Sequence, residues 1–439
     1  MRLLHRSLLF AGTVLLGGAA PDSFDIQSQI GPNPVLPEQQ QFLIPPMHLA
    51  TVSGWQPGQA PVAPPGMKVE ALATGLQHPR SVYTLPNGDV LISEAPGPNL
   101  EPVTRPKTII MHWVMSLVTP ASKKGESNRI TLVRDNGPGK PPTQTVFLDH
   151  LFSPFGVTLV GHDLYVANTD GILRFPYQDG DTKVTAPGTL LTELPGGPID
   201  HHWTKSLLAS EDGTKLYAGV GSNSNITENG IGAEKDRASI WEIDRATGAH
   251  RLFATGIRNP NGLCWEPTTH ALWAVVNERD ELGPDLVPDY MTSVKDGAFY
   301  GWPYSYYGQH VDPRVMPQRP DLVTKAILPD YALSSHVAPL GMAFNVGTAL
   351  PAKYAGGAFV GEHGSWDRDH FNGYKIVFIP FKDGKPSGKA EDFITGFLDD
   401  AGQAHGRPVA VTFDKSGALL IADDDGNTVW RVSAANSPK

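Results

Sequence analysis

The chain has 439 residues, of which 40% are hydrophobic, and its 46 glycines and 40 prolines suit many short strands better than long helices. Its formal net charge of −10 argues against nucleic acid as a partner, because a basic patch would have to supply that affinity. A single cysteine, Cys264, excludes internal disulfides, haem attached through CxxCH and a Cys/His zinc site, so any redox centre must bind non-covalently.

Residues 1–20, MRLLHRSLLFAGTVLLGGAA, have the layout of a secretory signal. A basic start is followed by an apolar run and then by small residues. The apolar run is shorter than the about 20 residues that a membrane span needs. We therefore expect cleavage near residue 20 and a periplasmic or secreted protein, with an uncleaved anchor as the alternative.

Two segments lie outside any repeat. Residues 21–65 are rich in Pro and Gln and have little periodicity, which predicts a tether or an arm lying on the main domain. Residues 96–128 form an insertion that contains the apolar stretch KTIIMHWVMSLV. This stretch fits a helix packed on the top face, a membrane-touching element or a partner site. We expect ordinary packing and do not predict membrane contact.

From residue 66 to residue 439 one phrase recurs six times: a polar or basic lead-in, usually a proline, and then a strand. The copies are GLQHPRSV (75–82), LFSPFGV (151–157), IDHHWTKSL (199–207), GIRNPNGL (256–263), HVAPLGM (336–342) and GRPVAV (406–411). An apolar strand that ends in a polar residue follows each copy, as in LISEA, LYVAN and LWAVVNE. A strand group repeated at a period above roughly 40 residues is the signature of stacked blades. The sequence thus predicts an all-β fold, a six-bladed β-propeller.

Corresponding positions of different blades meet near the axis of a propeller. The lead-ins bring basic and imidazole side chains there: His78, Arg80, His201, His202, Lys205, Arg258, Asn259, His336 and Arg407. The strand ends bring acids and amides: Glu94, Asn168, Asn277, Glu278, Glu362 and Asp423. Such a ring would suit a multiply anionic small molecule.

Several longer motifs carry a family resemblance. In chain order they are DHHWTKSLLASEDGTKLYAGVGSNSN, GIRNPNGLCWEP, LWAVVNERDELGPDLVPDYMTSVKDGAFYGWPYSY, HVAPLGMAF, AFVGEHGSWDRD and GRPVAVTFD. The set resembles the L-sorbosone dehydrogenase group of soluble quinoprotein sugar dehydrogenases over roughly residues 66–434. The resemblance implies a periplasmic propeller that holds pyrroloquinoline quinone (PQQ) over calcium. It also implies oxidation of sugars, polyols or aldehydes, with electrons passed to a separate acceptor.

The resemblance assigns His202 as the catalytic base. A neutral imidazole would remove the proton of a substrate hydroxyl as hydride leaves for the quinone. The plain alternative is a core histidine packed beside Trp203. His201 is the second choice of base and is otherwise expected near the substrate, and Asp200 is a candidate to orient either ring.

The same resemblance assigns cofactor and metal contacts. Arg258 and Asn259 match a pair that contacts the quinone oxygens, where a fixed positive charge would stabilise the developing oxyanion. The loop 277–285, NERDELGPD, matches a calcium-binding segment, with the backbone carbonyls of Glu278 and Arg279 as ligands. Asp289 matches an acidic residue near the substrate. A charged, solvated loop is the plain alternative for residues 277–285.

Other positions depart from the better-studied soluble glucose dehydrogenases. Arg368 or Lys375 would have to replace a lysine that binds a PQQ carboxylate, and His336 stands where a threonine is common. Arg407 alone clearly survives from a basic cluster in the sixth blade. The run 423–425, Asp-Asp-Asp, could suggest another calcium site but more often marks a solvated turn, which is what we expect here.

Two further functions are compatible with a propeller, because this fold supports both redox and hydrolytic chemistry. The first is a calcium-dependent hydrolase of the lactonase kind, whose metal would be centred on carboxylates and asparagines from several blades. The second is a propeller that only binds carbohydrate or a protein partner. The combination of His202 with Arg258 and Asn259 favours the quinoprotein.

Overall fold

The computed structural model describes residues 24–98, 105–118, 127–137 and 140–435. The predicted signal peptide, residues 1–20, lies outside these ranges.

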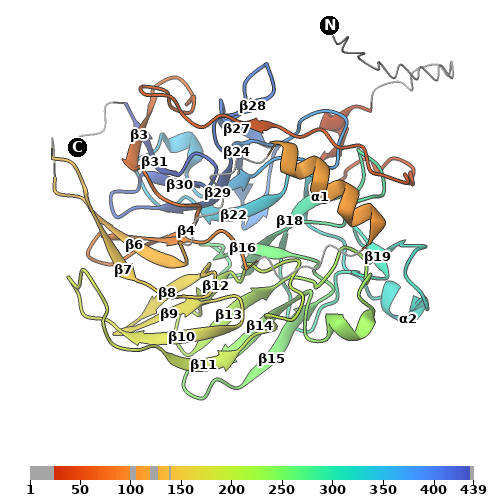
Figure 1. Cartoon of the computed structure of the whole chain (residues 1–439), viewed down its shortest axis with the longest axis horizontal. Coiled ribbons are helices and arrows are strands. Elements are labelled where there is room, and N and C mark those ends of the chain that lie inside the picture. Colours follow the sequence, from red (N-terminus) through yellow and green to blue (C-terminus); the bar gives the residue numbers. More distant parts are fainter. Residues whose placement is uncertain (1–23, 99–104, 119–126, 138–139, 436–439) are drawn as a thin grey trace, which may run out of the picture.

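Six antiparallel sheets stand around a central axis (Figure 1), which confirms the predicted six-bladed β-propeller. The first three blades are β4 (Pro79–Thr84), β5 (Val90–Glu94), β6 (Arg129–Arg134) and β7 (Thr143–Leu148); β8 (Val157–Val160), β9 (Asp163–Ala167), β10 (Gly171–Pro176) and β11 (Thr189–Glu193); and β12 (Leu207–Ala209), β13 (Lys215–Val220), β14 (Ser239–Asp244) and β15 (His250–Thr255). The last three are β16 (Pro260–Trp265), β17 (Leu272–Val276), β18 (Pro288–Ser293) and β21 (Tyr331–Ser335); β22 (Pro339–Phe344), β23 (Ala358–Glu362), β24 (Lys375–Ile379) and β27 (Glu391–Ile394); and β29 (Pro408–Phe413), β30 (Leu419–Asp423), β31 (Thr428–Ala434) and β3 (Met67–Ala73).

Each of the six repeated phrases leads into the innermost strand of one blade. These strands, β4, β8, β12, β16, β22 and β29, contact one another in sequence around the axis. Backbones approach so closely there that a side chain at Gly341 would lie 2.6 Å from the carbonyl oxygen of Val409 in the next blade. Glycine at this position therefore lets the fifth and sixth blades meet.

The second strand of a blade is covered by neighbouring blades on both of its faces. In β5, β17, β23 and β30 all five residues are buried. This explains why these strands appear in the sequence as continuous apolar runs and not as an alternation.

The ring is closed by strands from the two ends of the chain. β3 pairs with β31 from Met67↔Ala434 to Ala73↔Val429, so one blade contains both the first and the last long strand. Closure leaves only short, protected edges, which limits pairing with other chains.

The segment before β3 lies along the propeller. After a short 3-10 helix, η1 (Ile26–Gln29), the strand β1 (Ile30–Gly31) pairs with β21 and adds a fifth strand to the fourth blade. Further on, β2 (Thr51–Val52) pairs in parallel with β28 (Gln403–Ala404), and the Trp55 Nε1–H donates to Asp423 Oδ2 at 2.6 Å. The segment is thus fastened to distant blades.

The insertion contains the helix α1 (Pro106–Val118), which lies across one end of the propeller (Figure 1). Its outer side leaves Ile109, Ile110 and Trp113 exposed. Within the described ranges, no helix is both long and apolar enough to cross a membrane. The remaining elements are short: η3 (Ile231–Glu234), β19 (Ser305–Tyr306), β20 (His310–Val311), α2 (Pro320–Val323), η4 (Ala352–Tyr354), β25 (Phe381–Lys382) and β26 (Lys385–Pro386).

Candidate active site

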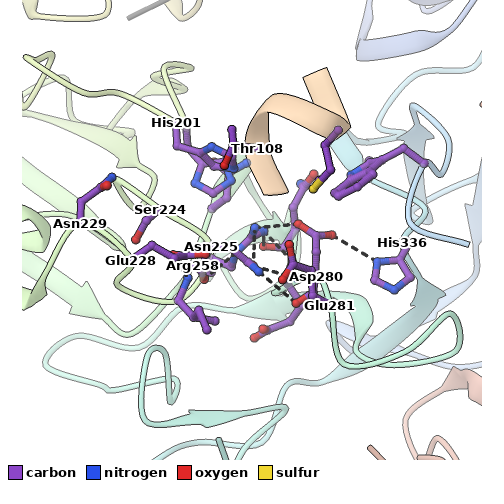
Figure 2. Close-up of a pocket in the computed structure, with 18 of the residues that line it drawn as sticks. Thr108, His201, Ser224, Asn225, Glu228, Asn229, Arg258, Asp280, Glu281 and His336 are labelled. Carbon is purple, nitrogen blue, oxygen red and sulfur yellow. Dashed lines mark hydrogen bonds and ion pairs between the residues drawn. The ribbon is translucent and has the colours of Figure 1, made fainter. Parts of the chain in front are cut away.

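A cavity of about 550 Å³ lies between the lead-ins of the third, fourth and fifth blades (Figure 2). Helix α1 covers part of it and contributes Lys107, Thr108 and Met111 to its wall. Eight of the residues predicted from the sequence also line it: His201, His202, Arg258, Asn259, Asn277, Glu278, Asp289 and His336. The propeller therefore brings together lead-ins that are up to 135 positions apart in the chain.

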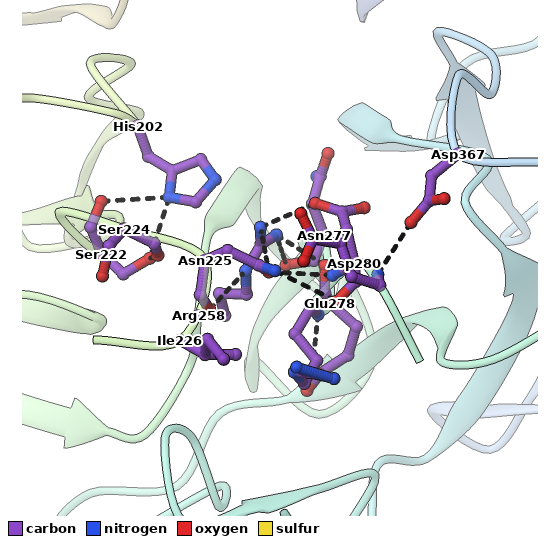
Figure 3. Close-up of polar contacts among 12 residues, drawn as sticks. His202, Ser222, Ser224, Asn225, Ile226, Arg258, Asn277, Glu278, Asp280 and Asp367 are labelled. Atoms are coloured by element: carbon purple, nitrogen blue, oxygen red, sulfur yellow. Dashed lines mark hydrogen bonds and ion pairs between the residues drawn. The ribbon is translucent and has the colours of Figure 1, made fainter. Parts of the chain in front are cut away.

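His202 presents one ring nitrogen to the protein and the other toward the cavity (Figure 3). Nδ1 lies 3.0 Å from the Ser222 carbonyl oxygen and 2.9 Å from the Ser222 hydroxyl. Because a carbonyl oxygen only accepts, Nδ1 carries the proton and Nε2 keeps a lone pair. Burial, Arg258 and the neighbouring His201 hold the pKa of His202 well below its usual value. The imidazole is consequently neutral at neutral pH, as a general base must be.

Buried charged side chains hold the main chain at His202 in place through hydrogen bonds. The Asp200 carboxylate accepts from Lys205 Nζ at 3.2 Å and from Arg237 Nη1 at 2.7 Å. Lys205 Nζ also donates to the carbonyl oxygens of His202, at 3.2 Å, and of Trp203, at 3.0 Å. Asp200 thus fixes the main chain of the histidine pair through Lys205. The His201 ring meets the His202 ring edge to face at 4.6 Å.

The Arg258 guanidinium is fixed by several acceptors at once. Nη2 donates to Asp280 Oδ2 at 2.9 Å and to Asn225 Oδ1 at 3.0 Å, and Nη1 donates to the Glu278 carbonyl oxygen at 2.5 Å. Burial alone would raise the pKa of Asp280, but the charge of Arg258 and the hydrogen bond from His336 lower it to about 2. The pair therefore stays ionised inside the cavity wall.

Asp289 joins two walls of the cavity. Its carboxylate accepts from the backbone N–H of Glu278 and of Ala338, both at 2.8 Å, so it ties the loop 277–285 to the lead-in of the fifth blade. Burial raises the pKa of Asp289 to about 7 and that of Glu278 to about 7. Both carboxyl groups are therefore partly protonated at neutral pH.

Asp280, His336 and Asp367 form a compact polar group beside Arg258. One ligand atom from each lies within 4.8 Å of the others. His336 Nδ1 is 3.3 Å from Asp280 Oδ1, a contact drawn in Figure 2, and its Nε2 is 3.1 Å from the Gly283 carbonyl oxygen. Asp367 Oδ2 accepts from the Glu281 N–H at 2.7 Å (Figure 3), whereas its buried Oδ1 has no hydrogen-bond partner among the described residues. The group offers oxygen atoms to a cation.

Two family models and a sequence relative match parts of this chain. The family model described as Glucose / Sorbosone dehydrogenase matches residues 160–365, which contain the cavity's three lead-ins, and a model described as TrAA12-like matches residues 322–435. An uncharacterised protein of Borreliella burgdorferi is 30% identical over 292 residues, covering 64% of this chain and 76% of that protein.

The chain belongs to the glucose/sorbosone dehydrogenase family. Solved structures share the fold at lower identity. The holo PQQ domain of pyranose dehydrogenase from Coprinopsis cinerea is 18% identical, with a TM-score of 0.69 over 88% of this chain and 100% of that one. A calcium structure of the Trichoderma reesei Carbohydrate-Active Enzymes Family AA12 protein is 19% identical, with a TM-score of 0.68 over 90% and 99%.

Three predicted contact residues of this glucose/sorbosone dehydrogenase family member do not line the cavity. Arg279 is buried, and its side chain pairs with Asp312 at 2.8 Å. Arg368 is buried, pairs with Asp285 at 2.7 Å and donates to Ser335. The third is Arg407, which donates to the carbonyl oxygens of His363 and Gly364 and stacks over the Tyr374 ring. Lys375, the alternative to Arg368, pairs with Asp392 at 2.6 Å.

The interpretation of residues 423–425 as a solvated turn is wrong, because all three aspartates are buried. Asp423 accepts four hydrogen bonds, from the N–H groups of residues 407 and 426 and from the indoles of Trp55 and Trp430. Asp424 is paired with Arg80 at 2.9 Å and with His363 at 3.0 Å. These carboxylates hold the blade end and the arm together.

Several residues of the site were missed in the sequence. Asn225, Asp280 and Asp367 lie inside motifs that carried the resemblance, yet none was named as a site residue, although an acid in NERDELGPD or WDRD is a plausible cation ligand. Lys107, Thr108 and Met111 come from an insertion with no repeat to align it. No sequence pattern placed α1 over this cavity rather than elsewhere on the same face.

Proposed function

We propose that this protein is a PQQ- and calcium-dependent dehydrogenase that oxidises a sugar, polyol or sugar aldehyde and passes the electrons to a separate acceptor. One observation carries the proposal. The neutral imidazole of His202, with its Nε2 lone pair toward the cavity, shares that cavity with the fixed positive charge of Arg258. Family membership and the PQQ-holding domain of similar fold support it.

The residues present fit a bound cofactor. The cavity volume of about 550 Å³ lies in the range of small-molecule sites, roughly 300–1,000 Å³. Two buried oxygens of its lining residues have no hydrogen-bond partner among the described residues, Asn259 Oδ1 and Glu278 Oε1, and Asp367 Oδ1, beside Asp280 and His336, is a third such oxygen near the cavity. Buried polar atoms normally have partners, so unpaired ones at a cavity wall indicate a site shaped for a ligand.

PQQ supplies, when bound, a quinone that accepts the substrate's hydride. His202 Nε2 would take the proton of the substrate hydroxyl, and its low pKa keeps it free to do so at neutral pH. Arg258 would hold a positive charge beside the site of oxyanion formation, and Asn259 would offer an amide to the same region. His201, next to His202, and Asp289 would face the substrate. His336, which also lines the cavity, would contact the cofactor as well.

Calcium takes six to eight oxygen ligands. The loop 277–285 would supply the carbonyl oxygens of Glu278, which also accepts from Arg258 Nη1, and of Arg279, and Asp280 would add a carboxylate from the same loop. The calcium structure of a protein of similar fold supports this metal.

A calcium-dependent hydrolase is the second candidate, and one observation favours it. Asp280, His336 and Asp367 place side-chain ligands around one point, as a metal hydrolase requires. Such an enzyme would work with calcium alone and would not need PQQ.

Reconstitution separates the two functions. Metal-free protein is supplied with calcium, with PQQ, or with both, and is assayed for dye reduction on a panel of sugars, polyols and aldehydes and for hydrolysis of a panel of lactones. We expect dye reduction only with both additions. Saturation at a hundred times Kd should also stabilise the fold by about 2.7 kcal/mol. Lactone hydrolysis with calcium alone, or an unchanged melting temperature with calcium and PQQ, would contradict the proposal.

We further propose export to the periplasm after cleavage near residue 20, on the basis of the signal layout of residues 1–20. Amino-terminal sequencing of the protein from a periplasmic extract tests this. An intact Met1 in the cytoplasmic fraction would contradict it.

A further inference from the structure

We propose that Ser222 is a positioning residue that holds His202 as the Nδ1–H tautomer and sets its place relative to Arg258. The inference rests on the proposed function for its catalytic meaning, but not for its structural test. Ser222 follows β13 in the short loop Gly221–Asn225, at the edge of the cavity, and is fully buried.

The contacts of the Ser222 hydroxyl determine the tautomer of the His202 imidazole. Ser222 Oγ lies 2.6 Å from the Ser224 carbonyl oxygen, to which it must donate its only proton. Toward His202 Nδ1, at 2.9 Å, the hydroxyl can therefore only accept, as does the Ser222 carbonyl oxygen at 3.0 Å. Two acceptors from one residue fix the proton on Nδ1, so the lone pair lies on Nε2.

The same residue also reaches the arginine. The Ser222 N–H donates to the Arg258 carbonyl oxygen at 2.8 Å, and Asn225 Oδ1, three residues on, accepts from Arg258 Nη2 at 3.0 Å. One loop thus bonds the His202 ring, the Arg258 main chain and the Arg258 side chain. A shift of this loop would move the base relative to the positive charge.

The loop is held rigidly enough for this task. Glu234, in η3, accepts from the Asn223 N–H at 2.6 Å and from Ser224 Oγ at 2.5 Å. Gly221 allows the close approach, since a side chain there would lie 2.4 Å from His202 Cβ and 2.6 Å from Asn259 Oδ1. Among the residues that the structure describes, no carboxylate is bonded to Nδ1, so the ring is oriented by neutral acceptors that leave it weakly basic.

The tautomer is measured directly on protein without PQQ or calcium. ¹⁵N-histidine-labelled protein is recorded at neutral pH, and His202 is assigned by the resonances that vanish in His202→Asn. We expect a protonated Nδ1 and an unprotonated Nε2. A protonated Nε2 would overturn the proposal, whatever the activity of the loaded enzyme.

The hydroxyl is tested by Ser222→Ala, with Ser206→Ala as the matched control. Ser206 is a buried serine of the same blade whose hydroxyl has no hydrogen-bond partner among the described residues. We expect Ser222→Ala to lower kcat about two- to tenfold, the range that one hydrogen bond is worth, with the Kd for PQQ unchanged. Ser206→Ala should match the wild type, and Ser222→Thr, which keeps the hydroxyl, should recover most of kcat.

The outcomes separate the inference from the function. An unchanged kcat in Ser222→Ala, or equal losses of kcat and PQQ affinity, would overturn the positioning role. If the Nδ1–H tautomer is found but no substrate is oxidised by wild-type protein, the proposed function fails while the structural assignment of the proton stands.

Discussion

Two groups of charged side chains at the same end of the propeller share one arrangement, an aspartate between an arginine and a histidine, but differ in their relation to the cavity. In the site group, Asp280 lies between Arg258, at 2.9 Å, and His336, at 3.3 Å. In the opposite group, Asp424 lies between Arg80, at 2.9 Å, and His363, at 3.0 Å. Both groups are built from lead-ins and strand ends, yet only the site group lines the cavity.

The charge balance of the two groups differs. Burial lowers the pKa of His336, but Asp280, Asp367 and Asp289 outweigh it and raise the pKa overall. The pKa of His363 is lowered, by burial and by the nearby charge of Arg407. Asp280 and Asp367 lie beside one arginine, Arg258, whereas Asp424 and Asp425 lie beside two, Arg80 and Arg407. The site group therefore retains more negative charge for a cation, although both groups bring two aspartates and a histidine within reach of one point.

The largest expected effect comes from His202→Ala, which removes the base beside the site group. Turnover should fall by about 10² to 10⁴, the usual worth of general-base catalysis, while the Kd for PQQ stays within a few-fold. Steady-state kinetics and a PQQ titration measure the two quantities. Near-normal turnover in His202→Ala, together with a large loss in His201→Ala, would show that the neighbouring histidine is the base.

Replacing the arginine that pairs with the aspartate in each group tests whether the two groups differ in function. Arg258→Ala should weaken PQQ binding and lower kcat, because its charge would act on the bound cofactor and on the developing oxyanion. Arg80→Ala removes the equivalent partner of Asp424, which keeps His363 at 3.0 Å, and should cost about 1.5–3 kcal/mol of stability, the range for a hydrogen bond to a charged group. It should leave the Kd for PQQ unchanged. Equal losses of PQQ affinity in both variants would mean that the groups do not differ in function.

The fold was predictable because its signal is repeated. Six copies of one phrase marked the six innermost strands, and the apolar runs after them marked the buried second strands. The same alignment of blades brought His202 and Arg258 toward the axis together with seven other lead-in residues, and the family resemblance then singled these two out.

The rest depended on contacts that the repeat does not encode. Arg407 occupies a lead-in like Arg258, but the carbonyl oxygens of residues 363 and 364 take its hydrogen bonds. Asp280 could not be paired with His336, 56 residues away, without the geometry of the loop. Helix α1 lies in an insertion, so its position over the cavity is set by tertiary contacts alone.

A smaller effect is expected from loosening α1, the wall that the opposite group lacks. Lys107 in the helix forms an ion pair with Glu281 in the loop 277–285, so this pair connects the two segments. Both side chains are partly exposed, so the pair is worth about 0.2–1 kcal/mol. If the pair holds the helix over the cavity, Lys107→Met should raise KM for the substrate by at most about fivefold, the equivalent of 1 kcal/mol, with kcat unchanged. Lys325→Met, on the exposed surface away from the cavity, is the control, and a large fall in kcat would show that the helix does more than cover the site.

The smallest effect concerns a strand-end acid in the blade that also carries His336. Burial raises the pKa of Glu362 to about 8, so the folded protein binds a proton there that the unfolded chain releases near its ordinary pKa. Its contribution to stability is complete below about pH 4.5 and is lost as the pH rises through 8.

Glu362→Gln cannot ionise, so its melting temperature should fall less than that of the wild type between pH 6 and pH 9. Glu391→Gln, an exposed acid of the same blade, should follow the wild type. Parallel curves for wild type and Glu362→Gln would show that Glu362 is already ionised in the fold over this pH range, so that burial does not raise its pKa to about 8.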